Sequence, residues 1–306
     1  MSEYKIGLLF PANGIEAAGN EKEILFSAIS SDVESRINNS AFLKSLGFVF
    51  KENNSYLFES ELNSQLATYI YSAVFSDYLK KSGVVSSCLA GYSLGIYAAL
   101  YHGGAVSFDD GLKIMHFIFK QTEASLSGFE FAMAGIIGFD TGFLTELLNS
   151  GFKSLKIINK NNKHSHVVSG YKDEIIRFLD TARSEGALSS KLLPVTAPYH
   201  TDFMREPSLK LLDFLKTLTI QNSEINIISG IDQRIFREKN EIIKELADNL
   251  IKSISWNNVM ENLLKMNMNI FIESGPGNSL YKISRFIPGD YQFYTMKTID
   301  KFYGLS

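Results

Sequence analysis

Apolar residues along the chain follow two spacings, and these predict its helices and strands. Short, nearly continuous apolar runs at 5–10 and 84–90 predict buried strands. Ser107 is in position to cap a helix that starts after it. Apolar residues three or four positions apart predict the helices, which we place near 21–50 and over 59–82 and 109–125. Strands that alternate with helices in this way are typical of an α/β fold.

A different order of elements begins near residue 127. The pattern predicts a strand, a helix, two strands, a helix and a last strand, at 132–139, 141–149, 155–159, 165–169, 173–185 and 191–195. This βαββαβ order is that of a ferredoxin-like unit. The earlier pattern then resumes, with helices near 203–217 and 239–252 and strands at 225–228 and 269–273. We therefore expect a large α/β-hydrolase-like body, residues 1–126 and 197–306, with an inserted ferredoxin-like small subdomain, residues 127–196.

Composition excludes several classes of protein. The 306 residues carry a net charge of −3, so the basic excess of a nucleic-acid surface is missing. The single cysteine, Cys88, excludes an internal disulfide and fits a reducing compartment. No apolar stretch is as long as a membrane span, and the apolar run near the N-terminus is too short for a signal-peptide core. We interpret the chain as a cytoplasmic protein with neither nucleic acid nor membrane as a partner.

The Gly-Tyr-Ser-Leu-Gly sequence at 91–95 is the main candidate for chemistry. It lies between an apolar run and a helix-forming run, the setting in which G-x-S-x-G forms a nucleophile elbow. The elbow would expose the Ser93 hydroxyl at a helix N-terminus, where backbone N–H groups can hold an oxyanion. The simpler alternative is a strand-to-helix turn with an incidental serine.

A nucleophilic serine needs a base, and His200 is the best-placed of the five histidines. It follows Pro198 in a stiffened segment where the chain leaves the expected subdomain. By position alone a structural loop histidine is the simpler interpretation, but the elbow favours a base. In α/β-hydrolases the histidine usually lies near the C-terminus, whereas many residues follow His200 here, so we rank that fold second.

Six segments together resemble the malonyl-CoA:acyl-carrier-protein transacylase family, which includes the acyltransferases of polyketide synthases. They follow the family's order and spacing over nearly the whole chain, at 10–14 (FPANG), 64–67 (SQLA), 91–96 (GYSLGI), 132–138 (AMAGIIG), 197–200 (APYH) and 272–277 (IESGPG).

The resemblance implies roles for these residues. Ser93 would attack an acyl thioester and His200 would take its proton. A backbone carbonyl near Ser255 would orient the histidine, and the backbone N–H groups of Leu94 and Asn13 would form the oxyanion hole. The acyl group would arrive on the phosphopantetheine arm of acyl-CoA or an acyl carrier protein, with no permanent cofactor and no metal. The family precedent implies a monomer.

Departures from the family pattern concern the substrate. Malonyl-selective members carry an arginine where an ungapped count places Ile118, and Lys120 would lie on another helix face. Because an isoleucine cannot neutralise a buried carboxylate, the pocket is expected to prefer a neutral acyl group. Phe117 and Phe119 would add to its apolar character. We expect the acyl-binding residues to be Gln65, Tyr92, Ile118 and Tyr199.

The sequence thus predicts acyl transfer through an acyl-serine, with a non-malonyl group, in polyketide or fatty-acid-type biosynthesis. A hydrolase that clears acyl groups from carrier proteins is an alternative, because only the second step differs. A catalytically dead module that docks carrier proteins is a further alternative, although such a module has no need of both Ser93 and His200.

Overall fold

The computed structural model describes residues 4–12, 21–48 and 60–304. Its larger sheet has the strand order β11-β10-β1-β2-β7-β8, in which neighbouring strands run parallel except β7 and β8. The strands are β1 Ile6–Phe10, β2 Cys88–Gly91, β7 Ile227–Ile228, β8 Ile235–Phe236, β10 Ile270–Glu273 and β11 Gln292–Thr295. The carboxyl ends of β1, β2 and β10 therefore meet at one edge, where ligands bind in open α/β sheets.

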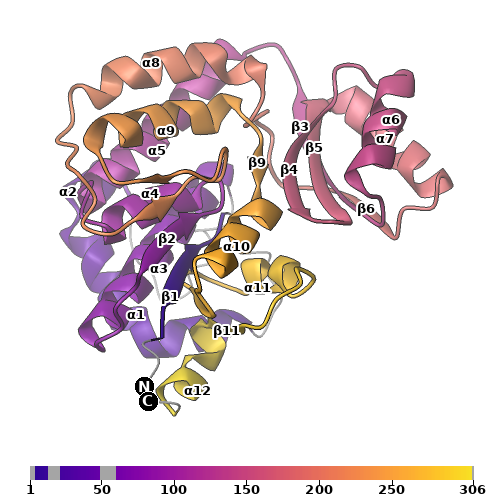
Figure 1. The fold of residues 1–306 in the computed structure, drawn as a ribbon. Helices are drawn as coiled ribbons and strands as arrows, with labels where there is room; N and C mark the ends of the chain where they lie inside the picture. Colours follow the sequence, from indigo (N-terminus) through magenta and orange to yellow (C-terminus); the bar gives the residue numbers. More distant parts are fainter. Residues whose placement is uncertain (1–3, 13–20, 49–59, 305–306) are drawn as a thin grey trace.

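Helices cover both faces of this sheet (Figure 1). Successive residues of β1 point to opposite faces, so that Leu8 packs in one apolar core and Leu9 in the other. The core around Leu9 is closed by α10 and α11, which span Trp256–Lys265 and Ser279–Ser284. The core around Leu8 includes α1 Glu21–Asn39, α2 Ala41–Ser45, α3 Glu61–Lys81, α4 Gly95–His102, α5 Phe108–Ser125, α8 Arg205–Leu215, α9 Lys239–Ile251 and α12 Ile299–Tyr303.

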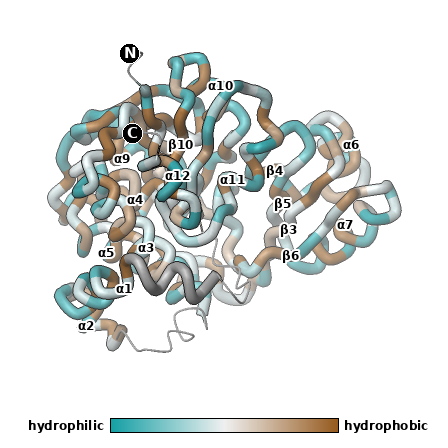
Figure 2. The backbone as a smooth tube through the Cα atoms, turned by 90° about the horizontal axis from the view of Figure 1, so that it is seen from below, coloured by the Kyte–Doolittle hydropathy of each residue, from teal (hydrophilic) through white to brown (hydrophobic). Residues whose placement is uncertain are grey.

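A second, smaller sheet has the order β6-β3-β5-β4-β9. Its strands are β3 Phe131–Ile137, β4 Lys156–Asn162, β5 Ser165–Tyr171, β6 Ser189–Leu192 and β9 Ile254–Ser255. The first four pair antiparallel in the ferredoxin-like order, so the expected fold class is confirmed. Helices α6, Thr141–Gly151, and α7, Lys172–Ser184, lie on the side of this sheet away from the body (Figures 1 and 2). The fifth strand, β9, comes from a part of the chain far beyond the expected subdomain and pairs parallel with β4.

Local signals account for where the elements begin and end. The Ser107 hydroxyl accepts a hydrogen bond from the Asp110 N–H (3.1 Å), as the capping prediction required. The strand expected from residue 84 begins only at Cys88. Residues before it close the preceding helix, because Gly83 has a φ of +82° and the Val84 N–H donates to the Leu79 carbonyl. No helix in the described part of the chain is long and apolar enough to span a membrane.

Candidate active site

The turn between β2 and α4 has the tight geometry of an elbow, with Ser93 at a φ of +52°. Its two glycines are required by close packing. A Cβ on Gly91 would lie 2.3 Å from the Ile96 nitrogen, and a Cβ on Gly95 would lie 2.0 Å from the Phe10 carbonyl oxygen. Both distances are far inside van der Waals contact. A larger residue at 91 would force the turn away from the start of α4, and one at 95 would force it away from β1. The sequence Gly-x-Ser-x-Gly is therefore a steric requirement of this turn.

The Ser93 Oγ lies 2.7 Å from His200 Nε2, across 107 positions of sequence. His200 also has a left-handed backbone, with a φ of +65°, and its N–H donates to the Leu250 carbonyl (2.7 Å). In the described ranges only four non-glycine residues have a positive φ, and the two members of this pair are among them. Such backbone strain persists where the surroundings hold a residue in place, as they do at many functional sites.

The other imidazole nitrogen, Nδ1, donates to the Lys252 carbonyl at 3.2 Å. The expectation that Ser255 supplies this carbonyl is therefore wrong. Helix α9 ends at Ile251, and Lys252 has an extended backbone (φ −109°, ψ 142°), which turns its carbonyl out of the helix toward the imidazole. Ser255 lies three residues further on, where its N–H donates to the Gly230 carbonyl and its hydroxyl caps α10.

Burial sets the charge of the imidazole. His200 is only 4% exposed, and desolvation lowers its pKa to about 4, although hydrogen bonds to the carbonyls of Lys252 and Asn249 oppose this shift in part. The side chain is therefore neutral near pH 7. With its proton on Nδ1, it presents the Nε2 lone pair to the serine hydroxyl, which is the arrangement that a general base requires.

One of the two predicted oxyanion donors can be placed. Leu94 is the N-cap residue of α4, and its N–H has no backbone acceptor among the residues that the structure describes. A free N–H at a helix start is suited to an oxyanion. Asn13, the other predicted donor, lies outside the described residues.

A cavity of about 40 Å³ adjoins the serine and the histidine. Its walls include Gln65, Ile118 and Tyr199, three of the four predicted acyl-binding residues. The remaining walls are Leu94, Tyr97, Met115, Asn249 and Leu250, together with Ser93 and His200. None of these lining residues is a lysine or an arginine. We call this space the inner cavity.

Two residues that were expected to line this cavity, Tyr92 and Phe117, have side chains that point elsewhere. Tyr92, the fourth predicted acyl-binding residue, points away from it and packs edge-on against Trp256, with ring centroids 5.7 Å apart. Phe117 also points elsewhere, because it stacks on Phe214 of α8 at 4.2 Å. Lys120 forms an exposed ion pair with Glu123, so it supplies no charge to the inner cavity.

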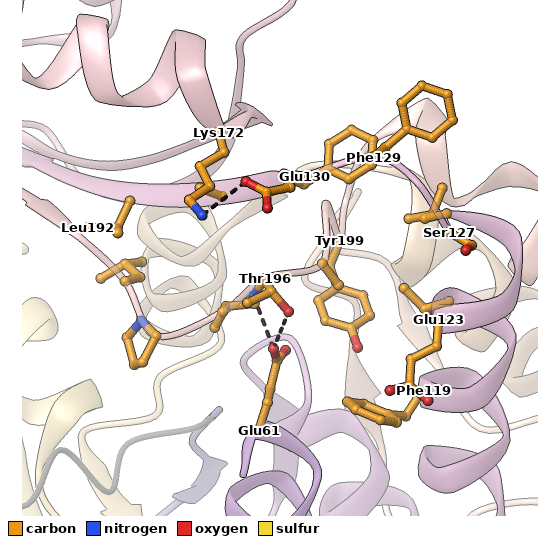
Figure 3. Close-up of a pocket in the computed structure, with 18 of the residues that line it drawn as sticks. Glu61, Phe119, Glu123, Ser127, Phe129, Glu130, Lys172, Leu192, Thr196 and Tyr199 are labelled. Carbon is orange, nitrogen blue, oxygen red and sulfur yellow. Dashed lines mark hydrogen bonds and ion pairs between the residues drawn. The ribbon is translucent and has the colours of Figure 1, made fainter.

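A larger cavity of about 740 Å³ shares Tyr199 with the inner cavity. Figure 3 shows the residues that line this larger space. The Glu61 carboxylate accepts hydrogen bonds from the N–H and the hydroxyl of Thr196, and Lys172 pairs with Glu130. We call this space the outer cavity. Its volume is typical of a small-molecule site. Its apolar lining residues are Phe119, Leu126, Phe129, Phe131, Ala132, Leu192, Leu193, Pro194, Val195 and Ala197.

The late Glu-Ser-Gly-Pro-Gly segment supports the site without reaching the inner cavity. Glu273 is fully buried and accepts hydrogen bonds from the N–H groups of Leu280 and Tyr281 at the start of α11. Burial raises its pKa to about 7. A Cβ on Gly275 would lie 2.4 Å from Pro11, so this glycine lets the segment pack against the residues that follow β1.

Sequence reasoning missed three residues near the pair. Lys252 acts through its carbonyl, which every residue has, so no sequence signal could identify it. Asn159 and Asn161 hydrogen-bond to Tyr92. Asn159 ends the strand expected at 155–159 and Asn161 lies just beyond it, and neither was expected to contact the elbow. Alternating asparagines could have indicated a strand face with a polar partner.

Known proteins resemble this chain over most of its length, although no protein-family model matches it. The chain is 26% identical over 288 residues to the malonyl CoA-acyl carrier protein transacylase of Bacillus subtilis, covering 90% of this chain and 88% of that protein. It is 30% identical over 226 residues to the polyketide biosynthesis malonyl CoA-acyl carrier protein transacylase BaeC of Bacillus velezensis, covering 71% and 75%. The crystal structure of an acyl-carrier-protein S-malonyltransferase from Burkholderia pseudomallei has the same fold, with a TM-score of 0.87, 21% identity and coverage of 98% and 99%.

Proposed function

Since this chain belongs to the malonyl-CoA:acyl-carrier-protein transacylase family, we propose that it transfers an acyl group between phosphopantetheine thioesters through an acyl-Ser93 intermediate. The observation that carries the proposal is the 2.7 Å contact between the Ser93 hydroxyl and the Nε2 of a neutral His200. Relatives of this chain are named as transacylases that act on acyl carrier protein, and one is named for polyketide biosynthesis.

In the first step the Ser93 oxygen attacks the thioester carbonyl carbon while its proton passes to His200 Nε2. The Leu94 N–H, at the start of α4, stabilises the negative charge on the carbonyl oxygen. As the carbon–sulfur bond breaks, the protonated imidazole returns the proton to the departing thiolate. The Lys252 carbonyl holds the Nδ1 proton throughout, so the imidazole keeps one orientation.

The second step repeats this chemistry with an acceptor. The thiol of a carrier protein or of CoA gives its proton to His200 and attacks the acyl carbon, which releases Ser93. Water in place of the thiol would give the free acid, so a hydrolase would use the same residues. A docking module without catalysis would need neither the hydrogen bond nor the buried neutral base.

We propose that the acyl group is neutral. An ungapped count places Ile118 where malonyl-selective members of the family carry an arginine. Ile118 lines the inner cavity and is only 4% exposed. A malonyl carboxylate in the inner cavity would find no cation among the lining residues, and an unpaired buried carboxylate costs several kcal/mol. The outer cavity offers acidic Glu61, Glu123 and Glu130, and its one lysine is already paired with Glu130.

The inner cavity also limits the size of the acyl group. Its volume of about 40 Å³ is small for a ligand site. Only a short acyl group fits there while Tyr199 stays in place, so the phosphopantetheine arm must lie outside this cavity.

Intact-mass measurement after mixing with acetyl-, malonyl- and longer acyl-CoA tests the proposal. An adduct of one acyl group that moves to an acyl carrier protein supports a transferase, and fast release of free acid identifies a hydrolase. Ser93→Ala is expected to abolish the adduct, and His200→Ala to slow its formation by a factor of about 10²–10⁴. No adduct from any donor, with carrier binding retained in Ser93→Ala, would refute the enzyme and indicate a docking module.

A further inference from the structure

The hydroxyl of Tyr92 joins the nucleophile's turn to the smaller sheet. It donates to Asn161 Oδ1 and accepts from Asn159 Nδ2, both at 2.7 Å. The hydroxyl end of the side chain is buried, which raises its pKa to about 12 and keeps it protonated at the pH values where enzymes work. A phenol can then donate one hydrogen bond and accept another at the same time. The ring is held by Trp256, so its direction is fixed by packing as well as by polar contacts.

Both asparagines lie on β4, and this strand also pairs with β9, which lies close in sequence to the residue that orients His200. In the parallel pairing of β4 with β9, Asn159 is opposite Ile254 and Lys160 is opposite Ser255. Strand β9 begins two residues after Lys252, whose carbonyl holds the imidazole. One strand of the subdomain thus connects to the residue before Ser93 and to the segment that orients His200.

The contact is also costly to remove. Asn159 is only 5% exposed, and its Oδ1 has no hydrogen-bond partner among the described residues, so its bond to Tyr92 is the polar contact that the structure gives its side chain. Loss of the hydroxyl would remove the hydrogen-bond partner of two further groups, Asn159 Nδ2 and Asn161 Oδ1, in side chains that are both buried. The two asparagine side chains would then no longer link β4 to the turn that carries Ser93.

We propose that Tyr92, Asn159 and Asn161 form a brace, which links the turn that carries Ser93 to strand β4 of the smaller sheet. The brace keeps the Ser93 hydroxyl within hydrogen-bond distance of His200. Tyr92 is a positioning residue, because its side chain does not line the inner cavity and acts on the nucleophile through the turn and through β4. The inference rests on the proposed function, since it concerns the reactivity of Ser93.

The test is Tyr92→Phe, which removes the hydroxyl and keeps the ring against Trp256. We expect the maximal rate of Ser93 acylation to fall about tenfold, with an unchanged half-saturating donor concentration, because misplacement of a reacting group slows chemistry more than binding. A second readout is the rate of Ser93 modification by a fluorophosphonate, in which the serine oxygen displaces fluoride from phosphorus. This rate should fall by a similar factor.

Tyr69→Phe is the matched control. Tyr69 is fully buried in the body, donates to the Phe108 carbonyl at 3.0 Å and does not line either cavity, so the variant loses a comparable hydrogen bond elsewhere. It should lower the melting temperature without changing either rate. Asn161→Leu should reproduce the slow acylation of Tyr92→Phe, and the two changes together should be no slower than either alone.

The outcomes separate the brace from the proposed function. If folded Tyr92→Phe has wild-type rates, or if only its half-saturating donor concentration changes, the proposal of the brace is wrong. The proposed acyltransferase function would be unaffected by either result. If Tyr92→Phe does not fold, the rates of Asn161→Leu decide in the same way. A wild-type protein that reacts with the fluorophosphonate but with no thioester would refute the proposed function, and the fluorophosphonate rates would still test the brace. Reaction with neither reagent would refute both.

Discussion

The proposed role of His200 as the base predicts an acid limit of catalysis that is set by the burial of its side chain. Only the neutral imidazole can take the proton of Ser93, so acylation should fail as pH drops through the pKa of His200. Burial places that pKa at about 4, compared with an ordinary value of 6.5. The perturbation to apply is therefore a simple change of pH from 8 to about 4.5.

The difference between the neutral fractions that the two pKa values give is largest near pH 5. There a histidine with an ordinary pKa is neutral in about 3% of molecules, whereas one with a pKa of about 4 is neutral in about 90%. Acylation at pH 5 should therefore be about 30 times faster than an ordinary histidine would allow, and nearly as fast as at pH 7.

Quenched-flow acylation with intact-mass detection measures this directly, because the first step is separated from transfer or hydrolysis. Circular dichroism at each pH provides the control that the protein remains folded. An acid limb with its midpoint near pH 6.5 in folded protein would show that the imidazole is solvated when it reacts, which would refute the reasoning from burial.

Three further predictions follow from particular contacts. Ile118→Arg should raise the preference for malonyl over acetyl donors at least about tenfold, measured as a ratio of kcat/KM, while the neutral control Ile118→Met leaves it unchanged; an equal ratio in both would contradict the pocket assignment. Gly95→Ala, whose Cβ would lie 2.0 Å from the Phe10 carbonyl oxygen, should lower the free energy of unfolding in urea by about 3 kcal/mol, and wild-type stability would mean that the turn can open. Burial lowers the pKa values of His102 and His166 to about 4, so the unfolded state binds more protons below pH 6.5. Urea denaturation should therefore show the free energy of unfolding falling from pH 6.5 toward pH 4, and a flat profile would contradict the buried neutral state.

Features that depend on short stretches of the chain could be predicted from the sequence. The elbow depends on two glycines that admit no Cβ, and the ferredoxin-like order depends on hydrophobic periodicity, so both could be predicted. Nothing local relates Ser93 and His200, which are 107 positions apart, so their pairing was inferred from the need of the elbow for a base and then supported by the family resemblance. The division into a body and a subdomain at 127–196 stays a prediction, as do the catalytic and binding roles of the site residues.

Two features could not be predicted, for different physical reasons. The carbonyl that orients His200 belongs to Lys252 rather than Ser255, because the exact end of α9 decides which carbonyl turns outward. Tyr92 faces β4 rather than the acyl group, because its direction depends on Trp256 and the asparagines, which come from distant parts of the chain. The direction of a side chain at a turn depends on tertiary contacts. A motif therefore predicts where the backbone of a residue lies but not where its side chain points.

Peptide mapping of the protein trapped during turnover tests the central claim most directly. After rapid acid quench with a short acyl-CoA, the peptide that contains residue 93 should carry the acyl mass as an ester on the serine, and the Ser93→Ala protein should carry none. An acyl group found on another residue, or transfer to carrier protein at an undiminished rate in Ser93→Ala, would contradict the account.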